Sequence, residues 1–351
     1  MNFAIDNTAG VAPAILDAIA RANEGYALGY GEDEITARVE RRLADVFEHE
    51  LAVFLLPTGT AANALALAQL TRPWGAVLCH AESHIVVDEC GATEFYGGGL
   101  RLLPLPGEGC KIASATLQAA LERGPWGGPH HVTPAALSLS QATEAGTSYR
   151  AAEIRQLAEI ARAHDVAVHL DGARFANALV RTNATPAEIT WRAGVDVLSF
   201  GATKGGALAA EAVIFFDPAR TKGMPERRKR GGHLLSKHRF LAAQLEAYLK
   251  DDLWLELARH ANRMADRLAA GLAAAGMKPA WPVEANEVFV PLSAEADRRL
   301  KAAGALYYPW YLGSLPAGLV IPPDHTLVRL VASFSTTEAE VDRFVTIARH
   351  A

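Results

Sequence analysis

A lysine and an aspartate stand just beyond two apolar segments of the chain. Lys204 lies in a run of small residues, 199–206 (SFGATKGG), that follows apolar residues 195–198, and Asp171 follows apolar residues 166–170. Either residue alone would more often be a solvated lysine or a turn aspartate. Two strand ends on one edge of a parallel sheet, however, form the place where α/β proteins bind ligands. A lysine that can form a Schiff base and an acid that can pair with a pyridinium nitrogen suit pyridoxal phosphate (PLP).

A phosphate could be held by residues 57–63 (PTGTAAN), which follow a predicted strand at 51–56 and begin a predicted helix. Gly59 and its small neighbours allow backbone N–H groups to approach an anion at the positive end of that helix. Thr58 and Thr60 add hydroxyl groups. A plain helix cap is the alternative, since threonine favours that position too.

His84 follows the predicted strand at 76–80, so we expect it at the same sheet edge. An imidazole there could stack on the pyridine ring and act as an acid or base near neutral pH. A solvent-exposed histidine at a helix start is the alternative. Asp88 and Glu89 are expected to orient the histidine or cap the helix, and no metal site is predicted.

Three groups of basic residues could bind anions. Arg174 lies shortly after Asp171, and Arg329 interrupts the apolar segment 327–331. Arginine binds carboxylates through two hydrogen bonds, and a charged residue in an apolar strand needs a partner. The partner would be an amino-acid carboxylate or an acid of the protein. The basic run 227–230 could bind a phosphate or an acidic partner, although such runs are more often solvated.

Predicted strands and helices alternate through the first two thirds of the chain, which is typical of an α/β fold with a mostly parallel sheet covered by helices on both faces. The strands are expected at 51–56, 76–80, 100–105, 135–140, 166–170, 196–200 and 211–216, and the helices at 60–70, 85–95, 114–123 and 151–163. After about residue 231 the pattern changes to helices at 234–249 and 253–274, followed by strands at 288–292 and 326–334 and helices at 294–303 and 337–348. We therefore predict a large domain over 1–245, with the N-terminal segment, and a smaller α+β domain over 246–351.

Composition limits the class of protein. The 351 residues carry a net charge of −5, which argues against a nucleic-acid surface. Cys79, Cys90 and Cys110 lack metal-ligand spacing and are expected to be reduced thiols of a cytoplasmic protein. No signal peptide is expected, and no segment approaches the roughly 20 apolar residues that span a membrane.

The chain resembles the low-specificity L-threonine aldolases, which are PLP enzymes of the aspartate-aminotransferase-like fold (fold type I). The resemblance runs nearly end to end. The matching segments are residues 6–10 (DNTAG), 30–33 (YGED), 58–63 (TGTAAN), 84–85 (HI), 171–177 (DGARFAN), 199–204 (SFGATK) and 328–331 (VRLV).

This resemblance implies roles residue by residue. It implies that the cofactor is bound by Gly59, Thr60, His84, Asp171, Arg174, Lys204 and Arg228. It implies that catalysis involves Lys204, Asp171, His84 and His130 (or, less readily, His131), and that the substrate is bound by Asp6, Tyr30, Arg174 and Arg329. The family assembles its sites across a subunit interface, so Tyr30, Arg228 and Lys229 would lie close to a neighbour's site in a homo-oligomer, expected to be a dimer of dimers.

The implied activity is the cleavage of L-threonine, L-allo-threonine and related L-β-hydroxy-α-amino acids to glycine and an aldehyde. His84, or a water that it holds, would be the base, with His130 as second choice. Another fold type I lyase such as a β-eliminase, an amino-acid racemase, and a non-enzyme that keeps an inactive PLP fold are the alternatives.

The chain departs from the family pattern at two positions. Ile5 stands where the family usually has a serine that helps to hold the substrate carboxylate, and Gly205 stands where asparagine is common. Without that hydroxyl we expect weaker binding or slower cleavage of small substrates such as threonine, and a preference for substrates with bulkier β-substituents.

Overall fold

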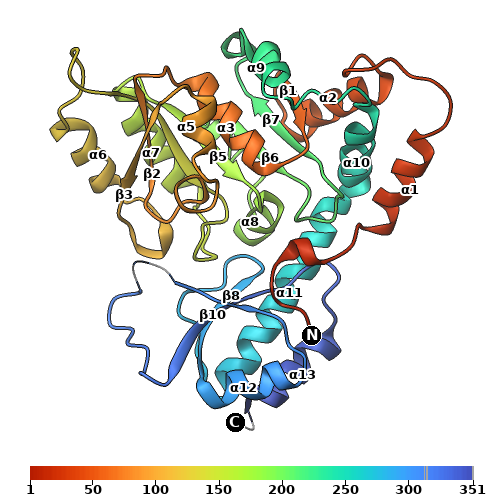
Figure 1. Cartoon of the computed structure of the whole chain (residues 1–351), viewed down its shortest axis with the longest axis vertical. Coiled ribbons are helices and arrows are strands. Elements are labelled where there is room, and N and C mark those ends of the chain that lie inside the picture. Colours follow the sequence, from red (N-terminus) through yellow and green to blue (C-terminus); the bar gives the residue numbers. More distant parts are fainter. Residues whose placement is uncertain (312, 314, 350–351) are drawn as a thin grey trace.

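The computed structural model describes residues 1–311, 313 and 315–349 and contains a large and a small sheet (Figure 1). The large sheet has seven strands in the order β1-β7-β6-β5-β4-β2-β3. Its strands are β1 (Ala52–Leu56), β2 (Gly75–His80), β3 (Arg101–Leu105), β4 (Thr133–Ser140), β5 (Ala167–Gly172), β6 (Val197–Gly201) and β7 (Glu211–Phe215). Five neighbouring strands are parallel, and only β7 runs antiparallel to its neighbours β1 and β6. The predicted mostly parallel sheet is confirmed.

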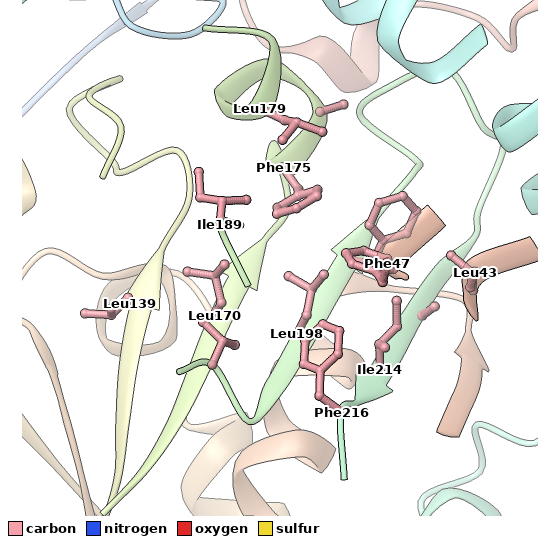
Figure 2. Close-up of a cluster of buried hydrophobic side chains, with 14 of the residues drawn as sticks. Leu43, Phe47, Leu139, Leu170, Phe175, Leu179, Ile189, Leu198, Ile214 and Phe216 are labelled. Carbon is pink, nitrogen blue, oxygen red and sulfur yellow. The ribbon is translucent and has the colours of Figure 1, made fainter. Parts of the chain in front are cut away.

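The central strands are buried because helices cover both faces of the sheet. Leu170, Leu198 and Ile214 lie side by side across β5, β6 and β7. Figure 2 shows them in one apolar cluster with Phe47 and Phe175, which come from helices packed on that face. This buried apolar layer fixes the strand ends that carry the polar residues of interest.

The helices of the large domain include α1 (Pro13–Ala22), α2 (Glu34–Phe47), α3 (Gly59–Leu70), α6 (Ser114–Arg123), α7 (Ala151–Ala163), α8 (Phe175–Thr182), α9 (Met224–Arg230) and α10 (Arg239–Leu249). Among them, the predictions at 60–70, 114–123 and 151–163 are confirmed by α3, α6 and α7, whereas α1, α2, α8 and α9 were not predicted. The prediction of one continuous helix at 85–95 is wrong. Two short helices occur instead, α4 (His84–Val87) and α5 (Ala92–Tyr96), because Cys90 and Gly91 adopt positive φ angles of 51° and 74° and break the helix. Likewise, α10 begins later than the predicted residue 234.

The small domain contains a three-stranded antiparallel sheet in the order β8-β10-β9. Its elements are α11 (Leu253–Ala274), β8 (Glu287–Ser293), α12 (Ala294–Ala302), β9 (Tyr308–Pro309), β10 (His325–Val331) and α13 (Glu338–Arg349). Helix α11 places Trp254 in the large core and Leu268 in the small core, so it links the two. Phe3 also packs in the small core, and the N-terminus lies beside that domain in Figure 1. The division of the chain near residue 245 stays a prediction.

Among the described residues, no helix combines the length and the apolar character needed to cross a membrane.

Candidate active site

A cavity of about 740 Å³ lies between the carboxyl edge of the large sheet and the small sheet. Seven of the residues to which the sequence analysis gave a catalytic, cofactor or substrate role line it: Gly59, Thr60, His84, Asp171, Arg174, Lys204 and Arg329. They come from segments far apart in the chain. Six of them meet because strands of the large sheet end at this edge, and Arg329 faces them from β10 of the small sheet. The structure therefore brings these residues into one site.

Asp171 is fixed at the end of β5. Its Oδ1 accepts a hydrogen bond from the Ala173 N–H at 3.0 Å, and its Oδ2 accepts one from Asn63 Nδ2 at 2.8 Å. Lys204 lies in the turn after β6 and lines the same cavity. Burial and the nearby Arg174 guanidinium lower the pKa of Lys204 below its usual value.

His84 belongs to a hydrogen-bonded chain that ends at Asp171. Its Nδ1 lies 2.8 Å from Glu89 Oε1, and Asn63 Nδ2 donates to both Glu89 Oε1 and Asp171 Oδ2 at 2.8 Å. Burial alone would lower the pKa of His84, but the Glu89 hydrogen bond and the Asp171 charge outweigh it and raise the pKa. Glu89 thus orients the histidine, as expected, and Nε2 remains the ring nitrogen that can serve a substrate. The role of Asn63 was not predicted.

Glu144 is a further acid in the cavity that the sequence analysis missed. Its Oε1 accepts hydrogen bonds from the His84 backbone N–H at 2.9 Å and from Ser140 Oγ at 2.7 Å. Its buried Oε2 has no hydrogen-bond partner within the described part of the chain. Burial raises the pKa of Glu144 to about 7. An acid just after the predicted strand 135–140 was the signal that could have found it.

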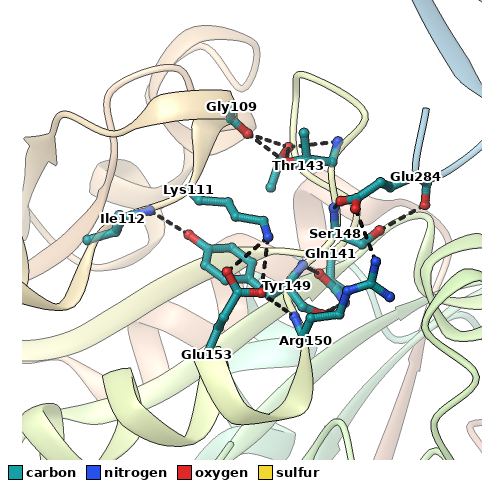
Figure 3. A network of polar contacts seen from close by, with 11 residues as sticks. Gly109, Lys111, Ile112, Gln141, Thr143, Ser148, Tyr149, Arg150, Glu153 and Glu284 are labelled. Carbon is teal, nitrogen blue, oxygen red and sulfur yellow. Dashed lines mark hydrogen bonds and ion pairs between the residues drawn. The ribbon is translucent and has the colours of Figure 1, made fainter. Parts of the chain in front are cut away.

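The loop that carries Glu144 is tied down on both sides (Figure 3). The Gln141 side chain makes two hydrogen bonds of 2.9 Å to the backbone N–H and C=O of Tyr149. Ser148 N–H donates to Glu284 Oε2 at 2.8 Å, which joins the loop to the chain entering β8. The loop is therefore held against both domains.

Arg174 and Arg329 form a cluster with two acids. Arg174 donates from Nε to Asp6 Oδ2 at 3.0 Å and from Nη2 to Asp6 Oδ1 at 2.7 Å. Burial opposes ionisation of Asp6, but Arg174 outweighs it and lowers the pKa of Asp6 to about 2. Glu287 Oε1 lies 3.3 Å from Arg174 Nη2 and 3.8 Å from Arg329 Nη1. Glu287 was not predicted as a site residue.

Arg329 stacks on the ring of Trp310. Its guanidinium carbon lies 3.9 Å from the centre of the Trp310 ring, and burial lowers the pKa of Arg329. Trp310, Tyr311 and Ile5 all line the cavity, and Ile5 is half-buried. The hydroxyl-free residue at position 5 therefore faces the site.

Some of the predicted site residues do not line the cavity of the chain to which they belong. His130 and His131 lie exposed in the loop between α6 and β4. Tyr30 is 50% exposed, with Lys229 Nζ 4.8 Å from its ring centre. Arg228 packs on the Phe54 ring and donates to the Leu55 carbonyl at 3.4 Å. Of these residues, none lines the cavity of the same chain.

The residues present fit PLP. A Cβ added at Gly59 would meet no atom within 4 Å, so space is open beside the N-terminus of α3. Thr58 caps that helix, accepting a hydrogen bond from the Ala61 N–H at 3.2 Å, as the alternative interpretation held. The cap and the open helix end are compatible with an anion. An amine, an acceptor carboxylate and a helix N-terminus thus converge on one cavity.

Comparisons with known proteins agree with this chemistry. The family model for beta-eliminating lyases matches residues 2–295. The low specificity L-threonine aldolase of Pseudomonas aeruginosa is 42% identical over 309 residues, covering 87% of this chain and 88% of that protein. The enzyme of the same name from a Pseudomonas species is 38% identical over 341 residues, covering 97% and 94%.

Solved structures give the same result. The threonine aldolase structure from Leishmania major superposes with a TM-score of 0.92 at 32% identity, covering 99% of this chain and 98% of that one. A structure of SPT with PLP has a TM-score of 0.72 at 17% identity, covering 100% and 86%, and shows likeness of fold alone.

Proposed function

The chain belongs to the beta-eliminating lyase family, and we propose that it cleaves L-threonine, L-allo-threonine and related L-β-hydroxy-α-amino acids to glycine and an aldehyde. The predicted fold type I architecture is confirmed, and PLP is the cofactor. The observation that carries the proposed reaction is the convergence of Lys204, Asp171 and His84 on one cavity. The enzyme is a carbon–carbon lyase.

The residues that would hold the cofactor follow from the chemistry of the cavity. Lys204 supplies the amine for covalent attachment, Asp171 the negative charge for the ring nitrogen, and His84 a flat face for the ring. Gly59 and Thr60 would offer donors to the phosphate at the N-terminus of α3. When bound, PLP accepts the electron pair released as the Cα–Cβ bond breaks.

His84 is the proposed base for the β-hydroxyl. With Nδ1 held by Glu89, Nε2 or a water bound to it would take the hydroxyl proton. The carbonyl of the aldehyde forms as the Cα–Cβ bond breaks, and a proton returned to Cα gives glycine. His130 remains the second choice, and it could act only if a neighbouring subunit brought it to the cavity.

The substrate carboxylate would bind chiefly to Arg329. Arg174 already donates two hydrogen bonds to Asp6, whereas Arg329 stacks on Trp310 and, among the residues that the structure describes, has one carboxylate in reach, Glu287 at 3.8 Å. The indole holds the guanidinium plane in place and leaves its edge for a carboxylate.

The active protein would be a homo-oligomer, a dimer of dimers, with sites shared between subunits. Tyr30 and Lys229 are exposed and contact each other away from their own cavity, which supports a role at a neighbour's site. Arg228 would approach a neighbour's cofactor phosphate. We place the enzyme in the cytoplasm, in keeping with its free cysteines.

Product analysis tests the function. The PLP-loaded protein is incubated with L-threonine, L-allo-threonine and phenylserine, and glycine and aldehyde are expected in equal amounts. Ammonia with a keto acid would instead indicate a β-eliminase, and formation of the D-isomer a racemase. Either result without glycine would refute the proposed aldol cleavage.

A further inference from the structure

Glu287 places a buried negative charge between the two arginines of the cavity. In the antiparallel register of β8 and β10, Glu287 is opposite Val331 and Arg329 is opposite Phe289, so Glu287 and Arg329 are diagonal neighbours on one face. Glu287 is 2% exposed and lines the cavity. Its Oε2 is buried and lacks a hydrogen-bond partner among the residues that the structure describes.

The two arginines differ in how they are neutralised. Arg174 donates two hydrogen bonds to Asp6, at 3.0 and 2.7 Å, and has Glu287 Oε1 as a second carboxylate, at 3.3 Å. For Arg329, Glu287 is the one carboxylate within ion-pair distance in the described part of the chain, at 3.8 Å. Two guanidinium groups therefore face two carboxylates, and the cluster is neutral before any ligand arrives.

A ligand carboxylate bound at Arg329 must lie beside the Glu287 charge. A simple carboxylate would leave this buried cluster with one excess negative charge, which is unfavourable in a region of low dielectric. An α-amino acid brings an ammonium group with its carboxylate and adds no net charge. Lys204 is a poor substitute for that ammonium, because in the PLP-loaded protein its amine would be taken up by the cofactor.

We propose that Glu287 is a specificity-determining residue that makes the site select zwitterionic α-amino acids over simple carboxylates. This inference rests on the proposed function, because it assigns the substrate carboxylate to Arg329. Glu287 acts by repelling simple carboxylates, and it needs no direct contact with a bound α-amino acid.

Glycine and acetate test the proposal, since they differ only by the ammonium group. Their affinities for the PLP-loaded protein are measured by calorimetry, with acetate followed by competition against glycine. In Glu287→Gln we expect the affinity for acetate to rise about tenfold and that for glycine to rise less. Glu287→Asp keeps the charge and should retain the preference of the original protein.

Glu284→Gln is the matched control. Glu284 precedes Glu287 on the same segment, but it pairs with Arg150 outside the cavity, at 3.1 Å (Figure 3). The ratio of glycine to acetate affinity should not change in this variant. If Glu287→Gln does not fold, Glu287→Met removes the same charge without adding a polar amide.

Two results would overturn the proposal: acetate binds no more tightly once the charge is removed, or glycine gains as much as acetate. These titrations measure binding and not turnover. Failure to cleave L-threonine, with the acetate shift present, would count against the proposed function alone. Cleavage without the shift would count against the role of Glu287 alone.

Discussion

Arg174 is bound by Asp6 through both oxygens of the carboxylate, at 3.0 and 2.7 Å. This pairing uses the Nε and one Nη of the guanidinium, so Arg174 offers a substrate carboxylate little beyond its remaining Nη. It also fixes the backbone next to Asp6, and there Ile5 lines the cavity without a polar group. The consequences for substrate binding can be measured at Ile5.

Ile5→Ser should raise the kcat/KM for L-threonine and reduce the difference in kcat/KM between L-threonine and phenylserine. A hydrogen bond to a charged group is worth about 1.5–3 kcal/mol, or a factor of roughly ten to a hundred. Kinetics with both substrates measure the effect. Ile5→Val is the control, because it supplies no hydroxyl and should leave the ratio of the two substrates unchanged. Lower stability in Ile5→Ser with the same substrate ratio would contradict the prediction.

Lys204→Ala should abolish turnover and the visible absorbance of the covalently held cofactor. Lys204 is the lysine that lines the cavity, and its lowered pKa suits attachment of a carbonyl group. Borohydride reduction followed by mass spectrometry locates the labelled residue. Lys250→Ala, at an exposed position, should be labelled like the original protein. A label on another lysine in Lys204→Ala would show that the assignment is wrong.

Asp171→Asn should keep the cofactor bound but lose most of the activity. A neutral amide cannot stabilise a protonated ring nitrogen, and loss of such a charged contact costs about 3 kcal/mol, roughly a hundredfold in rate. Cofactor content by absorbance and kcat by aldehyde release are measured together. Rates close to those of the unchanged enzyme would mean that Asp171 serves only as a turn residue.

Glu144→Gln should change how stability depends on pH. Because burial raises the pKa of Glu144 from 4.5 to about 7, the folded protein binds more protons than the unfolded chain between these values. Stability therefore falls as the pH rises through this window, by about 3 kcal/mol for this group. Glutamine keeps an acceptor for Ser140 and the His84 N–H, and it cannot ionise.

Urea denaturation of the PLP-loaded protein at pH 5 and pH 8 measures this effect. The variant should match the original protein at pH 5 and be more stable at pH 8. Some loss of stability with rising pH should remain, because burial also raises the pKa of Glu211 to about 7. An equal difference at both pH values would contradict ionisation of Glu144 as the cause.

Mixing Lys204→Ala subunits with Arg228→Ala subunits should restore some activity if the sites are shared. Each variant then supplies the residue that the other lacks. Lys204→Ala mixed with Asp171→Asn is the control, because both residues line the cavity of one chain and no complete site can form from their separate halves. Sedimentation gives the oligomeric state, and a fully active monomer would refute shared sites.

The sequence predicted the parts of the site that follow directly from strand patterns. Lys204 and Asp171 come just after apolar strands, and the ends of parallel strands share one sheet edge, so their proximity could be inferred. Glu287 and Asn63 were missed because their roles depend on tertiary contacts. Glu287 lies beside Arg329 through the pairing of β8 with β10, and it meets Arg174 only when the small sheet packs against the large domain. Asn63 lies within an apolar helix, where nothing marks it as the link between Glu89 and Asp171.

The residue at position 205, next to the lysine, limits which side chain can stand at position 248, more than forty residues later in the chain. A Cβ at residue 205 would lie 2.1 Å from the hydroxyl oxygen of Tyr248, a buried residue of α10. Asparagine, which the family resemblance implies at this position, therefore cannot enter while Tyr248 keeps its place. The two positions are expected to covary: chains with a side chain after the lysine should carry a smaller residue in place of Tyr248. Transplanting the lysine loop between relatives would then succeed only when both positions are exchanged together.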